Sequence, residues 1–424
     1  MFRPVKSLPK LSEQPTSPVS RLRFIPFRKK DVISMCLASG ELGGESQARF
    51  RTFTDLLKSV FHFEYHDKLE ALKDLYAPIN PDRDTRVVSV AEPEQGSFAL
   101  ALDQVLDKAN YERLDQRALM AAFDESSLFQ LKLNVNFDDY AEVMLYTRGE
   151  SQVTEKVKAA FGLVKKEVTF INYDRVVLYV RMKEHVASEL SAGKPGVTLL
   201  KLFQNVPRAD VEMLFPGTRL GMRTIDKFMI GVPALIGAGA IVMTNAGASL
   251  LLLVAFLGFY LGLSSEAIEL DEARLLAILA GLGGLFSYIW KQYSNFKNRK
   301  LLFMQSLTRS LYFKNLDNNA GVFYRLVDDA EEEECKEAIL AYYFLRQRSA
   351  GLSAAELDDE VEAWFREKWQ MEIDFEVDDG LNKLTRLGLA QESEGRYSVV
   401  DLDEACRLLD ERWDNYFSAT SREA

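Results

Sequence analysis

The sequence predicts an α+β multi-domain protein that is held in a membrane by a central helical hairpin. One observation is an uncharged run of 38 residues in the middle of the chain, with helix and strand patterns on both sides of it. Another is the charge distribution, because residues 331–424 contain 25 acidic and 11 basic side chains, a net charge of -14 in a chain of -11. The remainder therefore carries +3, and the acidity belongs to the carboxyl-terminal domain.

The first 22 residues are predicted to form a basic extended arm. The first thirty residues contain eight basic side chains, one acid and five prolines. Proline lacks the amide hydrogen that a helix interior needs, so this composition indicates an extended arm rather than a targeting helix. The three cysteines, Cys36, Cys335 and Cys406, form no C-x-x-C pair, which favours reduced thiols facing a cytoplasm.

Residues 23–204 are predicted to form a cytoplasmic α+β domain with helices and a small antiparallel sheet. The segment 50–82 has helical apolar spacing and ends at prolines. Residues 131–149 and 166–184 each have the pattern of two strands around a polar turn, and residues 196–203 have the pattern of one more strand.

The uncharged run from Phe228 to Ser265 is the strongest physical signal in the sequence. A hydrocarbon core is roughly 30 Å thick and a helix rises about 1.5 Å per residue, so about 20 residues suffice to cross it. A second apolar segment, Leu275 to Trp290, ends at Lys291. We therefore predict transmembrane helices over residues 228–291.

The basic flanks predict two crossings with both termini in the cytoplasm. Positive residues are retained on the cytoplasmic side, and they stand before the first run and after the second. Pro233 and residues 244–249 would break the long run. The alternative is three short crossings, which would place the basic carboxyl-terminal flank outside.

Polar and small residues within the apolar segments are the candidate intramembrane sites. Asn245 is the most polar of them, and we expect it at a turn or in an interhelical hydrogen bond rather than in a transport pathway. Small residues one turn apart allow close helix packing in a hairpin or a homo-oligomer. The predicted packing residues are Gly258, Gly262, Ala277, Ala280, Gly281 and Gly284.

Residues 205–227 are predicted to form a collar at the cytoplasmic face of the membrane. The stretch NVPRADVEMLFP has the pattern of a short helix that starts near Asn205 and stops before Pro216. Basic side chains at such a position can contact the phosphates of membrane lipids. The predicted lipid-headgroup residues are Arg208, Arg219, Arg223, Lys227 and Lys291.

Residues 292–330 are predicted to form a connecting helix, and residues 331–424 an acidic winged-helix-like domain. The stretch AEEEECKEAILAYYFLRQRS predicts a helix with acids in its first turn and bases in its last turn. The expected recognition helix, residues 375–387, contains three acids against Lys383 and Arg386. A phosphate backbone would be repelled, so we expect no nucleic-acid binding.

No catalytic motif is present, and we expect neither an enzyme nor a cofactor. GAGAIV lacks the last glycine of a dinucleotide-binding motif and lies inside the apolar run. His62 and His66, with Glu64 and Asp67 beside them, have the spacing of metal ligands on a helix. The chain has only one other histidine, however, and we predict an ordinary half-buried helix face without a metal.

Five sequence blocks carry a resemblance to a known family. The blocks are FIPFRKKDVI, LYAPINPD, KLFQNVPRADVEMLFPGTRLGMRTIDK, WKQYSNFKNRK and LYFKNLDNNAGVFYRLVDDAEEEECKEAILAYYFL. These blocks resemble the family of transmembrane protein 143 and its bacterial and plant relatives, which is catalogued as domain of unknown function 3754. They span nearly the whole chain from Arg23 onward. The resemblance implies an integral membrane protein and supplies no catalytic residue, and the absence of a transit peptide favours a bacterial cytoplasmic membrane.

Two function classes follow from these patterns. The first is a membrane-anchored scaffold or regulatory protein that binds a protein partner through its acidic carboxyl-terminal domain. The second is a transport or channel component that uses Asn245 and the broken helix. The large share of sequence outside the apolar segments, with few polar groups inside them, favours the scaffold.

Overall fold

The computed structural model describes residues 21–82, 96–115, 132–159, 164–183, 198–216, 219–221, 254, 261 and 271–417. The chain falls into two compact units. The first is drawn from Met1–Ser126, Asn136–Pro216 and Lys314–Ala424, and the second from Ser127–Val135 and Gly217–Phe313. Segments far apart in the sequence therefore build one unit, in which the sheet and the carboxyl-terminal helices belong together.

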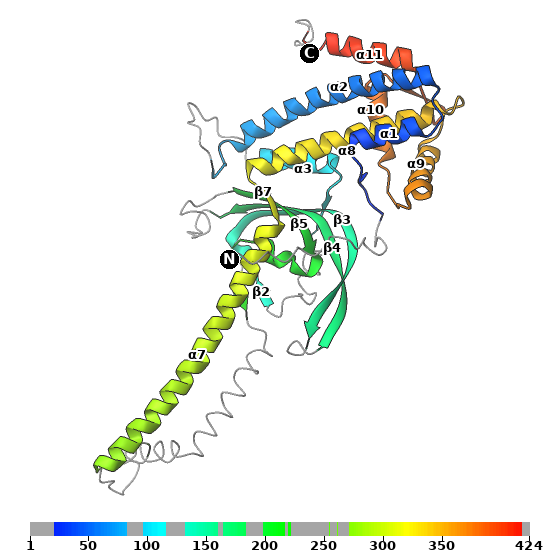
Figure 1. The fold of residues 1–424 in the computed structure, drawn as a ribbon. Helices are drawn as coiled ribbons and strands as arrows, with labels where there is room; N and C mark the ends of the chain where they lie inside the picture. The colour runs from blue at the N-terminus through cyan, green and yellow to red at the C-terminus, as the bar shows by residue number, and fades with distance from the viewer. Residues whose placement is uncertain are drawn as a thin grey trace, which may run out of the picture. The chain divides into compact units, whose positions relative to one another are not determined.

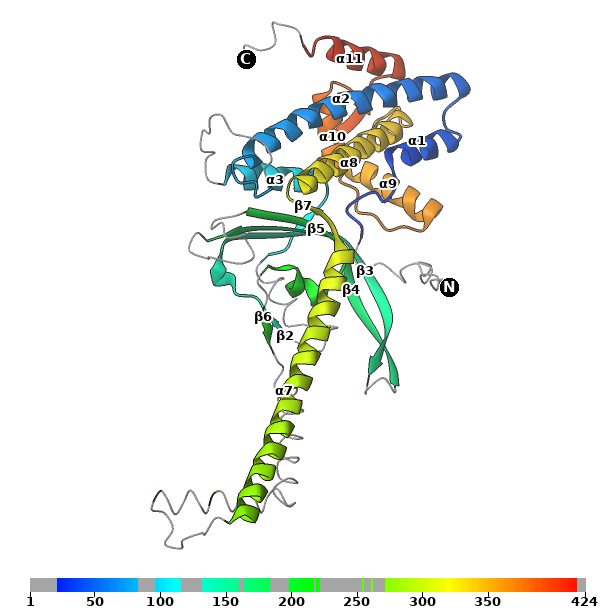
Figure 2. The same ribbon diagram turned by 60° about the vertical axis from the view of Figure 1, so that its left-hand side comes forward.

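The first unit consists of helices packed on one face of an antiparallel sheet, as Figures 1 and 2 show. Its helices are α1 (Lys29–Ala38), α2 (Gly44–Tyr76), α3 (Ser97–Lys108), α8 (Ala320–Arg346), α9 (Ala354–Trp369), α10 (Val377–Arg386) and α11 (Leu402–Asp414). Its strands are β1 (Glu112–Arg113), β3 (Tyr140–Ala159), β4 (Val164–Met182), β5 (Thr198–Pro207), β7 (Asn315–Asn318), β8 (Ala390–Ser393) and β9 (Arg396–Val399). Two short 3-10 helices are η1 (Phe137–Asp139) and η4 (Arg208–Leu214).

The main sheet has the strand order β1-β3-β4-β5-β7, and every neighbouring pair is antiparallel. Cross-strand partners share a face because side chains alternate along each strand. Met144 pairs with Tyr179 and Tyr179 with Leu200, and all three lie in the hydrophobic core beneath the helices. Helix η4 contacts β4 and β5 and buries Val211 and Met213.

Strand β4 corrects part of the predicted strand pattern. Residues 131–149 contain two strands, residues 132–134 and the start of β3, on either side of η1, as predicted. Residues 166–184 were predicted to form two more strands around a turn, but residues 164–182 form the single strand β4, which pairs with β3 along its whole length. Gly149 has a φ of +74° within β3, and the side chain of Asp174 lies where a Cβ would stand. Glycine therefore allows a local distortion of β3 at this position.

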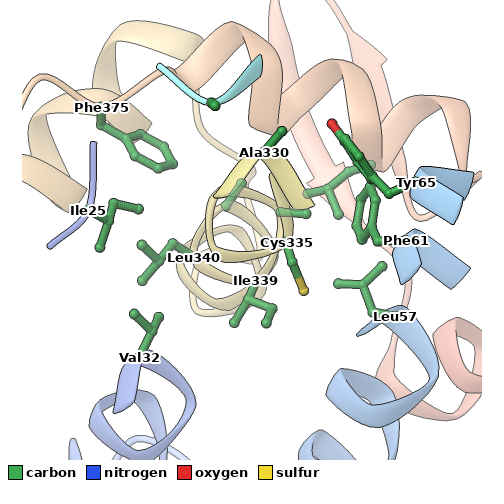
Figure 3. Packing of buried hydrophobic residues seen from close by; sticks show 14 of the residues in the cluster. Ile25, Val32, Leu57, Phe61, Tyr65, Ala330, Cys335, Ile339, Leu340 and Phe375 are labelled. Atoms are coloured by element: carbon green, nitrogen blue, oxygen red, sulfur yellow. The ribbon is translucent and has the colours of Figure 1, made fainter. Parts of the chain in front are cut away.

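Helix α8 lies at the centre of the helical layer. Its side chains are buried on all sides over most of its length, as expected for a helix surrounded by others. Figure 3 shows Ile25 and Val32 on one side of α8, and Leu57 and Phe61 from α2 on the other. The helical spacing predicted for α2 provides the buried face that packs here.

The elements after α8 follow the order of a winged helix. Helices α9 and α10 precede the hairpin β8–β9, and an isolated bridge pairs Leu352 with Tyr397. The two hairpin residues Glu394 and Gly395 both have positive φ, as a two-residue turn of type I′ requires. The side chains of these elements belong to the same hydrophobic core as those of α1, α2 and α3.

Helix α10 packs closely on α8 through Gly380. A Cβ at this position would lie 3.2 Å from the carbonyl oxygen of Glu337 and 3.3 Å from the Cβ of Ala341. We expect Gly380→Ala to lower the free energy of unfolding by about 1–2 kcal/mol, because overpacking outweighs the higher helix propensity of alanine. Denaturant unfolding measures the change. Gly283→Ala in α7 is the control, since nothing lies within 4 Å of its Cβ position; equal loss in both variants would contradict a specific contact at Gly380.

The second unit contains the long helix α7 (Glu272–Lys314) and a small sheet of β2 (Lys132–Asn134) with β6 (Arg219–Gly221). The last residue of α7, Lys314, is assigned to the first unit. Several large apolar side chains of α7 are exposed, among them Leu276, Phe286 and Trp290.

The structure corrects the predicted transmembrane hairpin and the predicted integral-membrane localisation. Among the described residues, no helix has both the length and the apolar character needed to cross a membrane. The second predicted span, Leu275 to Trp290, is the first part of α7, and Lys291 ends it after a rise of about 24 Å, which is less than the roughly 30 Å of a hydrocarbon core. The first predicted span, residues 228–265, lies outside the described residues except for positions 254 and 261.

Candidate functional site

A run of charged residues in the middle of α8 forms the polar centre of the first unit. Its buried members are Glu331, Glu333, Glu334, Lys336 and Glu337. These side chains are directed to different neighbours in the chain. The prediction that these acids lie in the first turn of their helix is wrong, because α8 begins at Ala320.

Two of these residues hold the segment that leads into α1. Glu333 accepts a hydrogen bond of 3.1 Å from the backbone amide of Ile25. Lys336 donates to the carbonyl oxygens of Ile25 and Phe27 at 2.6 and 3.0 Å, and to Glu333 at 2.9 Å. Burial raises the pKa of Glu333, while the ammonium of Lys336 opposes that rise. The segment is therefore fixed by a buried ion pair that also satisfies backbone groups.

Two more acids of α8 hold α10. The Nζ of Lys383 donates a hydrogen bond to Oε2 of Glu337 at 2.5 Å and lies 3.0 Å from Oε1 of Glu334. Asn110 donates to the other oxygen of Glu337 at 2.9 Å. Lys108 of α3 donates to Asp379 of α10 at 2.7 Å. We call these six residues the α8–α10 junction.

The junction shifts the pKa values of its members in opposite directions. Burial raises the pKa of Glu337 to about 7, although Lys383 and Asn110 favour the ionised form. Burial also disfavours the charged form of Lys383, but the carboxylates of Glu337 and Glu334 outweigh it and leave that pKa raised. For Asp379 burial acts against ionisation, and the two lysines outweigh it, so its pKa is lowered.

Three carboxylates of the junction come close enough to be considered as metal ligands. Oxygen atoms of Glu334, Glu337 and Asp379 lie within 4.8 Å of one another. Such oxygens suit calcium or magnesium, but the ammonium of Lys383 lies within 3.9 Å of all three residues. This lysine already supplies the positive charge that the carboxylates need, so we read the group as an internal ion-pair network.

The remaining basic side chain of α10 is also paired within the chain. Arg386 donates to both oxygens of Glu64 on α2, at 2.9 and 2.8 Å. Arg412 of α11 reaches the same carboxylate at 3.3 Å. Both basic residues of α10 therefore face acids of this chain, while Asp378, Asn382 and Thr385 lie on the exposed side of the helix.

A groove between α2 and α3 opens beside the junction. It has a volume of about 320 Å³, and its lining includes Lys68, Lys108 and the apolar side chains of Leu72 and Val105. The ammonium of Lys68 lies 4.2 Å from the ring centroid of Tyr65, and burial lowers its pKa. The lysines that line the groove lie close to acids of the same chain, which offset their positive charge. The groove therefore has no strong preference for an acidic or a basic ligand.

The four residues with metal-ligand spacing on α2 do not converge. His62 lies 2.9 Å from Glu331, and Asp67 accepts a hydrogen bond from Tyr416. Glu64 is occupied by Arg386 and Arg412, and His66 is exposed. The spacing in the sequence here reflects contacts with three different elements.

The predicted membrane residues are placed apart from this site or outside the described residues. Arg208 lies on η4, Arg219 on β6, and Lys291 on α7. Ala277, Ala280, Gly281 and Gly284 also lie on α7. Asn245, Gly258, Gly262, Arg223 and Lys227 lie outside the described residues. Their predicted roles in packing and lipid contact stay predictions.

Sequence reasoning missed the α8–α10 junction. Its signal was available as the string EEEECKE, whose charge is too dense for a helix that is otherwise so apolar. Such a string indicates a buried helix only if side chains elsewhere in the chain pair with its charged groups. In the junction these side chains lie more than 40 residues away along the sequence, before and after the string. A single sequence does not show which distant lysine pairs with which acid.

A comparison with known families matches the middle of the chain. The family model "Protein of unknown function (DUF3754)" matches residues 173–321. Residues 173–321 match a domain of unknown function. The match runs from within β4 to the start of α8 and includes β5, η4 and β7. No solved structure matches the chain.

Proposed function

We propose that this chain is a scaffold or regulatory protein that binds a protein partner through its acidic carboxyl-terminal region. The observation that carries this proposal is that both basic side chains of α10 are paired with acids of this chain. A winged helix that reads DNA inserts the helix at this position into the major groove. Here Lys383 is buried between acids and Arg386 is paired with Glu64. Nucleic acid would have to break those ion pairs to contact either basic side chain of α10.

The charge of the same region supports a protein partner with a basic surface. Residues 331–424 carry a net charge of -14, so a phosphate backbone is repelled and a basic protein surface is attracted. Elements on the outside of this region, such as the hairpin β8–β9 and helix α11, carry many of the exposed acids. Electrostatic attraction of this kind raises the rate of association and makes it sensitive to salt.

The wider relationship to the transmembrane protein 143 family belongs to this proposal as well. The match over residues 173–321 supports it, together with the resembling blocks that lie outside that range. Because that family supplies no catalytic residue, the relationship favours a binding role over an enzymatic one.

Capture with the full-length chain, followed by reconstitution from purified components, tests the proposed function. We expect a directly bound protein with a basic surface, whose affinity falls by about tenfold or more between low and high salt. Duplex DNA at physiological salt should show no measurable binding in a fluorescence anisotropy titration. Micromolar binding of duplex DNA, or failure of every captured protein to bind in purified form, would contradict the proposal.

A further inference from the structure

We propose that four aromatic side chains, on α2, on α11 and directly after α11, form the docking site for a basic segment of the partner, in which an arginine or lysine stands next to an apolar side chain. The aromatic surface consists of Phe63, Trp413, Tyr416 and Phe417. This inference rests on the proposed function and names the position and the chemistry of the contact.

The rings of the aromatic surface are packed around Phe63. Its ring centroid lies 5.9 Å from that of Trp413, 4.1 Å from that of Tyr416 and 5.2 Å from that of Phe417. All three pairs meet edge to face. The hydroxyl of Tyr416 donates to Asp67 at 2.9 Å, which fixes this ring further. The surface is therefore pre-organised, so a partner would not have to order it.

Two of the four rings remain largely in contact with solvent. Trp413 is 42% exposed and Phe417 is 69% exposed. Exposed apolar side chains that gather in one place mark interaction sites more often than scattered ones do. Tryptophan and tyrosine are also the residues most enriched among those that dominate binding energy.

Unpaired acids stand next to the exposed tryptophan. Asp410 lies one helical turn before Trp413, and Asp414 follows it directly. Within the described part of the chain, neither carboxylate has an ion-pair or hydrogen-bond partner, whereas Glu404 and Glu411 of the same helix are paired with Arg407. These two acids are therefore available for a basic side chain from outside.

The charge of the surface selects one kind of partner segment. A cation over the face of Trp413 is attracted by the ring and by both neighbouring acids. An acidic segment would find no such attraction, because Arg412 already faces Glu64. An entirely apolar segment would cover the rings and leave Asp410 and Asp414 without a counter-charge. A basic side chain beside an apolar one satisfies both features.

Calorimetric titration of the full chain with short synthetic peptides tests the inference. A peptide that alternates arginine and leucine should bind, while peptides that alternate glutamate with leucine, or arginine with serine, should bind at least about tenfold more weakly. Trp413→Ala should weaken binding of the first peptide by at least about tenfold. The double variant Asp410→Asn, Asp414→Asn should weaken it by about three- to tenfold and reduce its salt dependence.

Matched controls separate this surface from general charge and general apolarity. Asp359→Asn removes an exposed acid of α9, and Leu100→Ala removes an exposed apolar side chain of α3. Both should bind the peptide like the wild type, and circular dichroism should show all variants folded. Unchanged affinity in Trp413→Ala, or tighter binding of the glutamate peptide, would overturn the inference.

The purified partner distinguishes this inference from the proposed function. A partner that binds the wild type and loses at least about tenfold in affinity for Trp413→Ala supports both. A partner that binds the wild type and Trp413→Ala equally overturns the aromatic docking site and leaves the binding role intact. If no protein is found that binds this chain directly, the proposed function itself is overturned.

Discussion

Lys383→Met is expected to lower the free energy of unfolding by about 3–5 kcal/mol. The ammonium of Lys383 lies between Glu334 and Glu337, and the side chains of all three are at most 7% exposed. Removing the lysine leaves Glu337 without a counter-charge and leaves Glu334 with only the ammonium of Lys108, 3.7 Å away, so the desolvation of these buried carboxylates is less well offset. Asn110 can still donate to Glu337, but it offers no charge.

Chemical denaturation of the wild type and the variant measures this effect. Lys368→Met on α9 is the control, because it makes the same substitution at an exposed position and should change stability by less than about 0.5 kcal/mol. Adding Glu337→Gln to Lys383→Met should recover part of the loss, since one uncompensated charge is then removed. A loss below about 1 kcal/mol for Lys383→Met would show that the junction is not an important source of stability.

The free energy of unfolding is expected to rise as the pH falls from about 8 toward 5, and Glu337 should supply up to about 3 kcal/mol of that rise. Burial raises the pKa of Glu337 in the folded chain to about 7, from the ordinary glutamate value of 4.5. Between pH 4.5 and about pH 7, Glu337 is protonated in the folded state and ionised in the unfolded state. Protonation therefore favours the folded chain, and the penalty for an ionised buried carboxylate appears as the pH rises through 7.

Comparison with Glu337→Gln isolates this contribution. The variant cannot titrate at this position, so its stability should vary less between pH 8 and pH 5 than that of the wild type. Asp358 also has a raised pKa, about 6, and acts in the same direction in both proteins. Asp379 has a lowered pKa, so its contribution is lost only under more acidic conditions. Parallel stability curves for wild type and Glu337→Gln would contradict the assignment to Glu337.

Apolar spacing was sufficient to predict the elements that pack through one regular face. In α2, the side chains of Phe50, Phe53, Leu57 and Phe61 recur every three or four residues, and all of them are buried. Local sequence determines such a helix because the residues of its buried face lie within a few positions of each other.

Other elements could not be predicted because distant contacts determine them. The stretch NLDN, expected within a connecting helix, forms β7 because β5 offers an unpaired edge more than 100 residues earlier. At the end of β5 the sheet also takes residues Asn205 to Pro207, which were expected at the start of a short helix. In both cases sheet pairing overrides the local pattern. The short helix itself is present as the 3-10 helix η4, and it stops before Pro216 as predicted.

The candidate site was partly predictable in its charge and not in its structure. The acidity of residues 331–424 and the acids beside Lys383 led to the expectation that nucleic acid would be repelled, which remains untested. The sequence did not show that Lys383 is buried, nor that Arg386 reaches Glu64 across 322 positions. Likewise, Phe63 and Trp413 are brought together only by the packing of α11 on α2.

Hydrogen–deuterium exchange of the full chain, alone and with its purified partner, tests the central claim most directly. If the ion pairs of Lys383 and Arg386 hold α10 in place and the aromatic surface is the docking site, the amides of Leu381 to Arg386 should exchange as slowly as those of α8 in the free protein. Partner binding should then slow exchange around Trp413 and leave α10 unchanged. Rapid exchange of α10 in the free chain, or new protection of α10 on binding, would contradict the claim.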